Sequence, residues 1–159
     1  MPGTAEPLSL LGTEIAPGTA QRLSWSATEL FEGVPVSTPV LVLNGAFPGP
    51  TLCLTAAVHG DELNGVEIIR RLLKRKVLKS LRGTLLAVPI VNVHGFLDQS
   101  RYLPDRRDLN RSFPGSESGS MAGRLAHTFM ESIVTQCTHG IDLHTGAIGR
   151  ENLPQIRAE

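Results

Sequence analysis

The fold is decided by the stretch TLCLTAAVHGDE, which occupies residues 51–62. Residues 51–58 are almost continuously apolar, as in a central strand that is buried on both faces of a sheet. Gly60 then allows a tight turn, and Asp61 is a plausible N-cap for a following helix. Apolar residues recur at spacings of three and four over residues 63–78. The stretch therefore predicts a strand, a turn and an amphipathic helix in direct succession.

Strands and helices continue to alternate on both sides of this stretch. The first 20 residues are rich in Gly, Pro and Ala and predict an extended lead-in with one short strand. Residues 92–119 show no regular pattern, and a long irregular stretch inside a compact domain is usually functional. Further strands are predicted at 21–27, 39–44, 83–91 and 141–144, and a further helix at 121–134. We therefore predict one α/β domain over residues 1–159, with a mixed, largely parallel sheet flanked by helices.

Composition and charge exclude several classes of protein. Hydrophobic residues make up 41% of the chain and charged residues 19%, which is typical of a soluble globular protein. The formal net charge is zero and no basic stripe is present, so we expect no nucleic-acid partner. No apolar run approaches the roughly 20 residues that cross a bilayer, and the N-terminus does not resemble a signal peptide. We therefore expect no membrane partner and a cytoplasmic location.

Three residues have the chemistry and placement of metal ligands. His59 and Glu62 lie three residues apart on the predicted turn, and His144 lies at the end of another predicted strand. Active sites of α/β sheets gather at the carboxyl ends of strands. A catalytic zinc commonly takes two histidines and one carboxylate, and leaves one position open for water. A capping glutamate beside a surface histidine remains the alternative for His59 and Glu62 when these two are taken alone.

A second motif, Asp108-Leu109-Asn110-Arg111, lies in the irregular region. An arginine guanidinium recognises a carboxylate through two parallel hydrogen bonds, so Arg111 can hold a carboxylated substrate, with a further bond from Asn110. Asp108 can accept the second ring N–H of a ligating histidine and so fix its orientation. An ordinary turn with an exposed arginine is the alternative interpretation.

Together, three motifs resemble those of the succinylglutamate desuccinylase/aspartoacylase family, a branch of the zinc carboxypeptidase superfamily. They are His59-Gly60-Asp61-Glu62, Asp108-Leu109-Asn110-Arg111-x-Phe113-Pro114-Gly115 and Asp142-Leu143-His144-Thr145-Gly146, in the same order as in the family. The resemblance covers about residues 58–157 and implies a zinc carboxypeptidase-like fold.

The resemblance also implies residue roles. His59, Glu62 and His144 would bind one zinc ion per chain, although cobalt or manganese can occupy such ligands. Asn110 and Arg111 would hold the substrate carboxylate. Arg101 would polarise the scissile carbonyl, with Arg107 as its rival. Asp108 and Asp142 would lie behind the ligands, and Asp108 would support His59.

The sequence departs from the family in one respect. The family's general-base glutamate lies well after the third zinc ligand, and Glu151 and Glu159 follow His144 too closely to match it. Either the chain is a fragment that lacks a C-terminal part, or another group supplies the base. We favour the fragment, which would be inactive for lack of that glutamate and would tend to dimerise or aggregate through uncovered apolar surface. Residues 150–155 either line the pocket or form a polar loop.

The function that we expect is zinc-dependent hydrolysis of the amide bond in a small carboxylated N-acyl amino acid. Two alternatives remain open: a carboxypeptidase-type peptidase of the same superfamily, and a metal-binding module without catalytic activity. A nucleotide-binding domain is disfavoured, because no Gly-rich phosphate-binding pattern follows any predicted strand.

Overall fold

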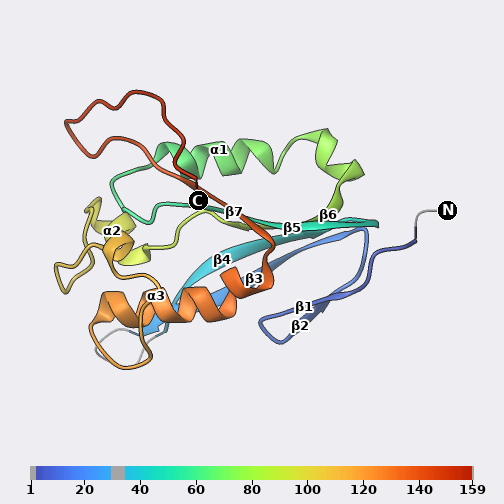
Figure 1. Ribbon diagram of the computed structural model, residues 1–159, viewed down its shortest axis with the longest axis horizontal. Coiled ribbons are helices and arrows are strands. Elements are labelled where there is room, and N and C mark those ends of the chain that lie inside the picture. Colours follow the sequence, from blue (N-terminus) through green and yellow to red (C-terminus); the bar gives the residue numbers. More distant parts are fainter. Residues whose placement is uncertain (1–2, 30–34, 159) are drawn as a thin grey trace.

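A computed structural model describes residues 3–29 and 35–158 of the chain. It shows a central sheet with helices on both faces and a small separate hairpin (Figure 1). The hairpin is formed by β1 (Leu8–Leu10) and β2 (Thr13–Ile15), so the predicted lead-in contains two short strands where one was expected. Leu10 and Ile15 on the hairpin are buried in the main core.

The sheet has five strands in the order β3-β4-β6-β5-β7. The pairs β3–β4 and β4–β6 are antiparallel, whereas β6–β5 and β5–β7 are parallel. The expected mixed sheet is confirmed, and its parallel part is confined to the three strands β6, β5 and β7. The bounds are β3 (Thr19–Glu29), β4 (Pro35–Asn44), β5 (Phe47–Ala56), β6 (Arg82–Val88) and β7 (His139–Leu143).

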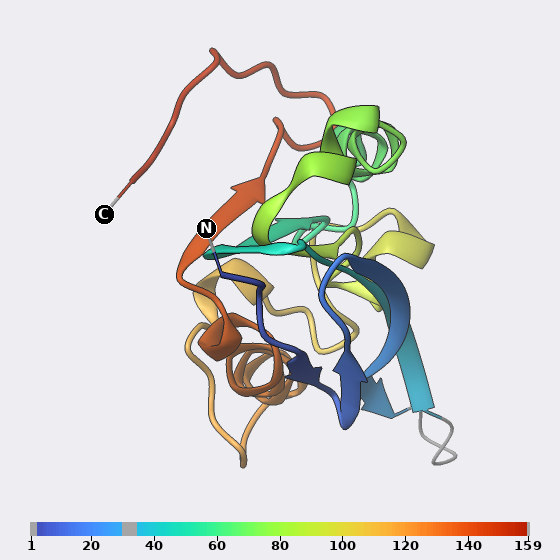
Figure 2. The ribbon, with the colours of Figure 1, turned by 90° about the vertical axis from the view of Figure 1, so that its right-hand side faces the viewer.

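Two apolar clusters fill the space on opposite faces of the sheet. On one face, α1 (Asn64–Leu72) packs Ile69 against Leu54 and Ala56 of β5. On the other face, α3 (Met121–Ser132) packs Leu125 and Phe129 into the cluster that includes Trp25 (Figures 1 and 2). Because β5 and β6 lie between the clusters, both are apolar on both faces, as the continuous apolar run predicts.

The helix after the turn is shorter than its periodicity predicts. We expected one helix over residues 63–78, but α1 ends at Leu72 and a separate 3-10 helix, η1 (Lys76–Ser80), follows. Leu78 on η1 still packs against the same cluster as α1, so the apolar spacing continues across the break. A spacing of three to four residues does not distinguish a continuous α-helix from an α-helix followed by a 3-10 helix.

The region predicted to be irregular contains two short helices. These are α2 (Val93–Asp98) and the 3-10 helix η2 (Leu109–Arg111), and another 3-10 helix, η3 (Val134–Gln136), follows α3. Asn92 starts α2 by accepting a hydrogen bond from the backbone N–H of Gly95 at 2.8 Å. Six residues with a glycine in the third position give almost no periodic signal, so the prediction of no regular element in 92–119 was wrong for α2.

Within the two described ranges, every helix is too short or too polar to cross a lipid bilayer.

Candidate metal centre

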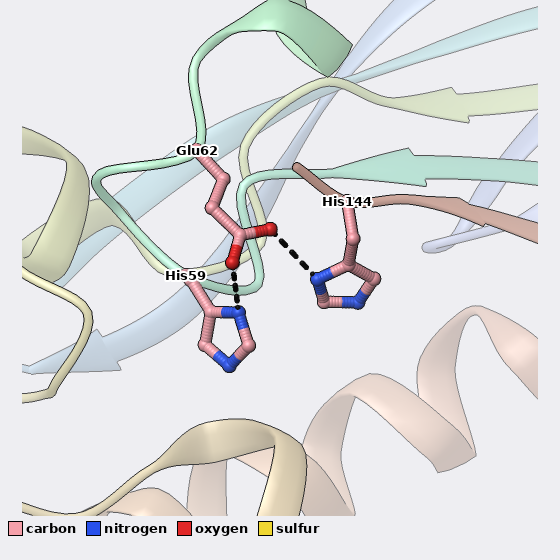
Figure 3. A group of neighbouring side chains, drawn as sticks. All are labelled: His59, Glu62 and His144. Atoms are coloured by element: carbon pink, nitrogen blue, oxygen red, sulfur yellow. Dashed lines mark hydrogen bonds and ion pairs between the residues drawn. The ribbon is translucent and has the colours of Figure 1, made fainter. Parts of the chain in front are cut away.

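The predicted ligands come from two strands that lie side by side. His59 and Glu62 lie on the turn between β5 and α1, and His144 directly follows β7. Because β5 and β7 are parallel neighbours, their carboxyl ends meet at the same edge of the sheet. Figure 3 shows the three side chains converging from these two segments.

Glu62 stands between the two histidines. Its Oε1 lies 2.8 Å from Nδ1 of His59, and its Oε2 lies 2.9 Å from Nδ1 of His144. The backbone N–H of Thr145 also donates to Oε2 at 2.9 Å. One nitrogen or oxygen atom from each of the three side chains lies within 4.8 Å of the others, and His59 and Glu62 are each only 2% exposed. The donor set of two imidazoles and one carboxylate fits a zinc ion.

The second ring nitrogen of each histidine faces another carboxylate. Nε2 of His59 lies 3.0 Å from Oδ1 of Asp108, and Nε2 of His144 lies 2.5 Å from Oδ2 of Asp142. A carboxylate at this position holds the proton on Nε2 and leaves the lone pair of Nδ1 for a metal. Asp108 and Asp142, the two residues predicted to lie behind the ligands, thus each contact the second ring nitrogen of a candidate ligand.

These contacts shift the pKa values of the charged groups. The hydrogen bond that His144 donates to Asp142 raises the pKa of His144, and the adjacent Glu62 adds to this effect against the opposing effect of burial. For Asp108, burial raises the pKa, but hydrogen bonds from His59 and Arg101 outweigh it and leave a net lowering. The ring of His144 thus lies between two carboxylates, those of Glu62 and Asp142, which both favour its protonated form.

Arg101, and not its rival Arg107, reaches the centre. Its Nε and Nη2 donate to Oδ2 of Asp108 at 3.1 and 2.9 Å, and its Nη1 lies 3.5 Å from Oε1 of Glu62. Arg107 is exposed, and its backbone N–H bonds to Asp105. Arg101 is thus the guanidinium that can reach a carbonyl oxygen near the metal position.

Asn110 and Arg111 lie on η2, which starts where Asp108 accepts a hydrogen bond from the backbone N–H of Asn110 at 2.9 Å. Both residues line a cavity of about 1080 Å³ that also contains His59, Glu62 and His144. Arg111 is exposed, and its Nη1 donates to the backbone carbonyl of Asn110 at 3.3 Å. This placement leaves the guanidinium at the cavity wall, where a substrate carboxylate can approach.

The segment after β7 forms another wall of the cavity. It begins at a turn in which the backbone N–H of Ile148 donates to Asp61 at 3.2 Å, and it then arches away from the rest of the chain (Figure 2). The expected N-cap role of Asp61 is therefore wrong, because α1 begins after Leu63 without a side-chain cap. Of the two interpretations of residues 150–155, the structure favours pocket lining, and the lining residues of this segment are Arg150, Asn152, Leu153, Pro154, Gln155 and Arg157. Glu159 lies outside the described residues.

Two contributors to the centre were not found from the sequence. Gly60 is needed because its backbone lies against α2: a Cβ atom there would lie 1.8 Å from the carbonyl carbon of Gly95. Thr55 on β5 donates to Oδ1 of Asp142 at 2.7 Å. Both contacts join segments distant in sequence, so neither produces a local pattern.

Comparison with known proteins decides the family. The model of the succinylglutamate desuccinylase/aspartoacylase catalytic domain matches residues 48–159. The chain belongs to this family. A curated relative, the N-alpha-acetyl-L-2,4-diaminobutyric acid deacetylase of Halomonas elongata, is 33% identical over 120 residues, which are 75% of this chain and 35% of that protein.

Solved structures, among them members of the desuccinylase/aspartoacylase family, share the fold. A succinylglutamate desuccinylase/aspartoacylase from Rhodobacter sphaeroides superposes with a TM-score of 0.69 at 32% identity, over 79% of this chain and 40% of that one. A metallo-carboxypeptidase from Burkholderia cenocepacia, 20% identical, superposes with a TM-score of 0.60 over 80% of this chain and 36% of that one, which shows the fold alone. The chain thus spans well under half the length of these relatives.

Proposed function

We propose that this protein is a zinc-dependent hydrolase that cleaves the amide bond of a small carboxylated N-acyl amino acid. The observation that carries the proposal is the carboxylate of Glu62 between two Nδ1 atoms, each on a ring whose Nε2 faces a further carboxylate. This arrangement presents three ligands to one ion from two rigid strand ends. Membership of a family named for deacylation of amino acids supports the amide chemistry.

Each group at the site has a role in this proposal. A bound zinc ion supplies a water molecule that is acidic enough to act as hydroxide near neutral pH. Arg101, fixed by Asp108, donates to the carbonyl oxygen as negative charge develops there. Asn110 and Arg111 bind the substrate carboxylate and orient the amide toward the ligands. Proton transfer to the leaving amine needs a further carboxylate, which the family resemblance implies lies beyond His144 in longer chains.

Metal content tests the first half of the proposal. After removal of metals and reconstitution with zinc, elemental analysis should find about one zinc per folded chain. His59→Ala should lose this zinc, because it removes one of the three ligands. His139→Ala is the matched control, since His139 lies at the other end of β7 and is exposed. A folded wild-type protein without zinc would contradict the proposed centre.

Substrate profiling tests the second half. Release of free amine from N-acetyl and N-succinyl amino acids should depend on the substrate's α-carboxylate, and the matching carboxamides should react far more slowly. Faster cleavage of C-terminal residues from peptides would indicate the peptidase alternative. Zinc binding without turnover of any amide by the full-length protein would indicate the non-catalytic module.

A further inference from the structure

Thr55 is a buried hydroxyl on a strand that is otherwise apolar around it. It lies near the carboxyl end of β5, is 6% exposed, and faces Asp142 directly in the register of the parallel pair β5–β7. A hydroxyl in such surroundings costs free energy unless it is hydrogen-bonded. Leu54 and Ala56, its neighbours in sequence, point to the opposite cluster under α1. Thr55 is therefore a polar exception on the face of β5 that lines the cavity.

The hydroxyl of Thr55 is directed at one carboxylate oxygen. Oγ1 lies 2.7 Å from Oδ1 of Asp142 and 3.5 Å from the backbone carbonyl of Ile141. A threonine hydroxyl has one proton to donate, and the shorter distance to a charged acceptor assigns it to Asp142. The other oxygen of Asp142, Oδ2, bonds to Nε2 of His144. The two oxygens of this carboxylate are thus divided between Thr55 and the metal ligand.

The same division occurs on the opposite side of the centre. Oδ1 of Asp108 lies against Nε2 of His59, and Oδ2 of Asp108 accepts a hydrogen bond from the guanidinium of Arg101. Behind each histidine, a donor bound to the second oxygen of the carboxylate fixes the plane of that carboxylate. The donor to Asp108 is the charged guanidinium of Arg101, and the donor to Asp142 is the neutral hydroxyl of Thr55.

We propose that Thr55 is a positioning residue for the metal ligand His144 and acts through Asp142. The inference rests on the proposed metal centre and adds a residue to it. The side chain of Asp142 is 35% exposed, so water competes for its oxygens and it has rotational freedom on the cavity side. The hydroxyl on the buried side removes that freedom. It holds Oδ2 against Nε2 of His144, so that Nδ1 points to Glu62 and the ion.

Zinc affinity of three variants tests the proposal, measured by competition with a chromophoric chelator. Thr55→Val keeps the shape but removes the donor, and should weaken zinc binding about tenfold, the lower end of the range for such outer contacts. Thr55→Ser restores the donor and should bind zinc within about twofold of wild type. Thr38→Val is the matched control, because Thr38 is also buried but donates to the backbone carbonyl of Ile90 rather than to Asp142. Equal affinity of Thr55→Val and wild type would overturn the inference.

A double-mutant cycle separates this role from general damage to the fold. In an Asp142→Asn background, Thr55→Val should have little further effect on zinc affinity, because the two residues act in series. Additive effects of the two substitutions would show that Thr55 acts independently of Asp142 and would overturn the inference.

A measurement on the metal-free protein distinguishes failure of this inference from failure of the proposed function. In wild type, the Nε2 proton of His144 should give a strongly downfield NMR signal, as expected of its short bond to Asp142. Thr55→Val should shift or broaden this signal, while Thr55→Ser and Thr38→Val should not. An unchanged signal overturns the role of Thr55 even if zinc binds. A changed signal in a protein that binds no zinc would support the contact and refute the proposed function alone.

Discussion

Substitution of Gly60 by alanine should break the metal centre without touching a ligand. Gly60 lies between His59 and the Asp61-Glu62 pair, and its backbone N–H donates to the carbonyl of Ser100 at 3.0 Å. A Cβ atom at this position would lie 1.8 Å from the carbonyl carbon of Gly95 and 2.2 Å from the backbone nitrogen of Phe96. Ordinary van der Waals contact begins at about 3.4 Å, so one of the two backbone segments must move by more than 1 Å.

The size of the effect follows from what has to move. The atoms in the way are backbone of α2, which cannot rotate aside as a flexible side chain can. Overpacking of this kind typically costs about 1–3 kcal/mol of unfolding free energy, and a backbone clash belongs at about the upper value. About 3 kcal/mol corresponds to a fall of roughly 6–12 °C in the melting temperature of a domain of this size. Because metal ligation tolerates errors of only about 0.2 Å, zinc affinity should fall by at least about a hundredfold.

The assay compares Gly60→Ala with Gly140→Ala in thermal unfolding and in zinc competition. Gly140 lies on β7 close to the site, but a Cβ atom there meets nothing within 4 Å. The control should therefore keep its melting temperature and its zinc affinity. If Gly60→Ala matched the control in both measurements, the close approach of the turn to α2 would not exist in solution, and the reasoning would be refuted.

Three further predictions concern charge, substrate binding and packing. His144 has a raised pKa, chiefly because of Asp142, so in the metal-free protein it stabilises the fold fully below about pH 6.5, and this contribution is lost as pH rises through the raised value. Denaturant unfolding across pH should show this loss in wild type and a smaller loss in Asp142→Asn, where Glu62 still raises the pKa of His144, and an identical pH slope would contradict the prediction. Zinc affinity should show the opposite trend and fall as the pH drops, because a proton on Nδ1 competes with the ion. Arg111→Lys should raise KM for a carboxylated substrate about tenfold with a smaller change in kcat, because an ammonium cannot form the paired bonds of a guanidinium; an unchanged KM would remove Arg111 from the carboxylate site. Ile69→Ala should cost about 2–5 kcal/mol of unfolding free energy, since Ile69 is fully buried between α1 and the sheet. Ile68→Ala is the control and should cost about 0.5 kcal/mol or less, because Ile68 is 52% exposed. Equal costs would contradict the packing of α1.

The sequence was informative where function depends on local order along the chain. The apolar run over residues 51–58 predicted a strand buried on both faces, and Cys53 and Leu54 do face opposite clusters. His59 and Glu62 follow one predicted strand, and His144 follows another. Because parallel strands end at one edge of a sheet, this order predicted a common site. These inferences need only the period of the side chains and the direction of the strands.

Local patterns failed where a distant backbone segment competed with them. Asp61 has the composition of an N-cap, yet its carboxylate accepts from Ile148, 87 residues further along the chain. Here a tertiary contact outweighs the local propensity. In α2, a Cβ atom at Gly95 would lie 2.5 Å from Nδ2 of Asn92 and 2.7 Å from the carbonyl oxygen of Ser100, so a residue with a higher helix propensity does not fit there.

By itself, the sequence determined the class of fold, the three candidate ligands and the family, because these depend on residue type, spacing and order. Only the tertiary structure decided which groups fix the two carboxylates behind the ligands. Arg101 is distinguished from Arg107 by the path of an irregular segment, and Thr55 meets Asp142 only because β7 lies next to β5 rather than next to β6. The order of strands in a sheet is set by the packing of the whole chain, and no local pattern encodes it.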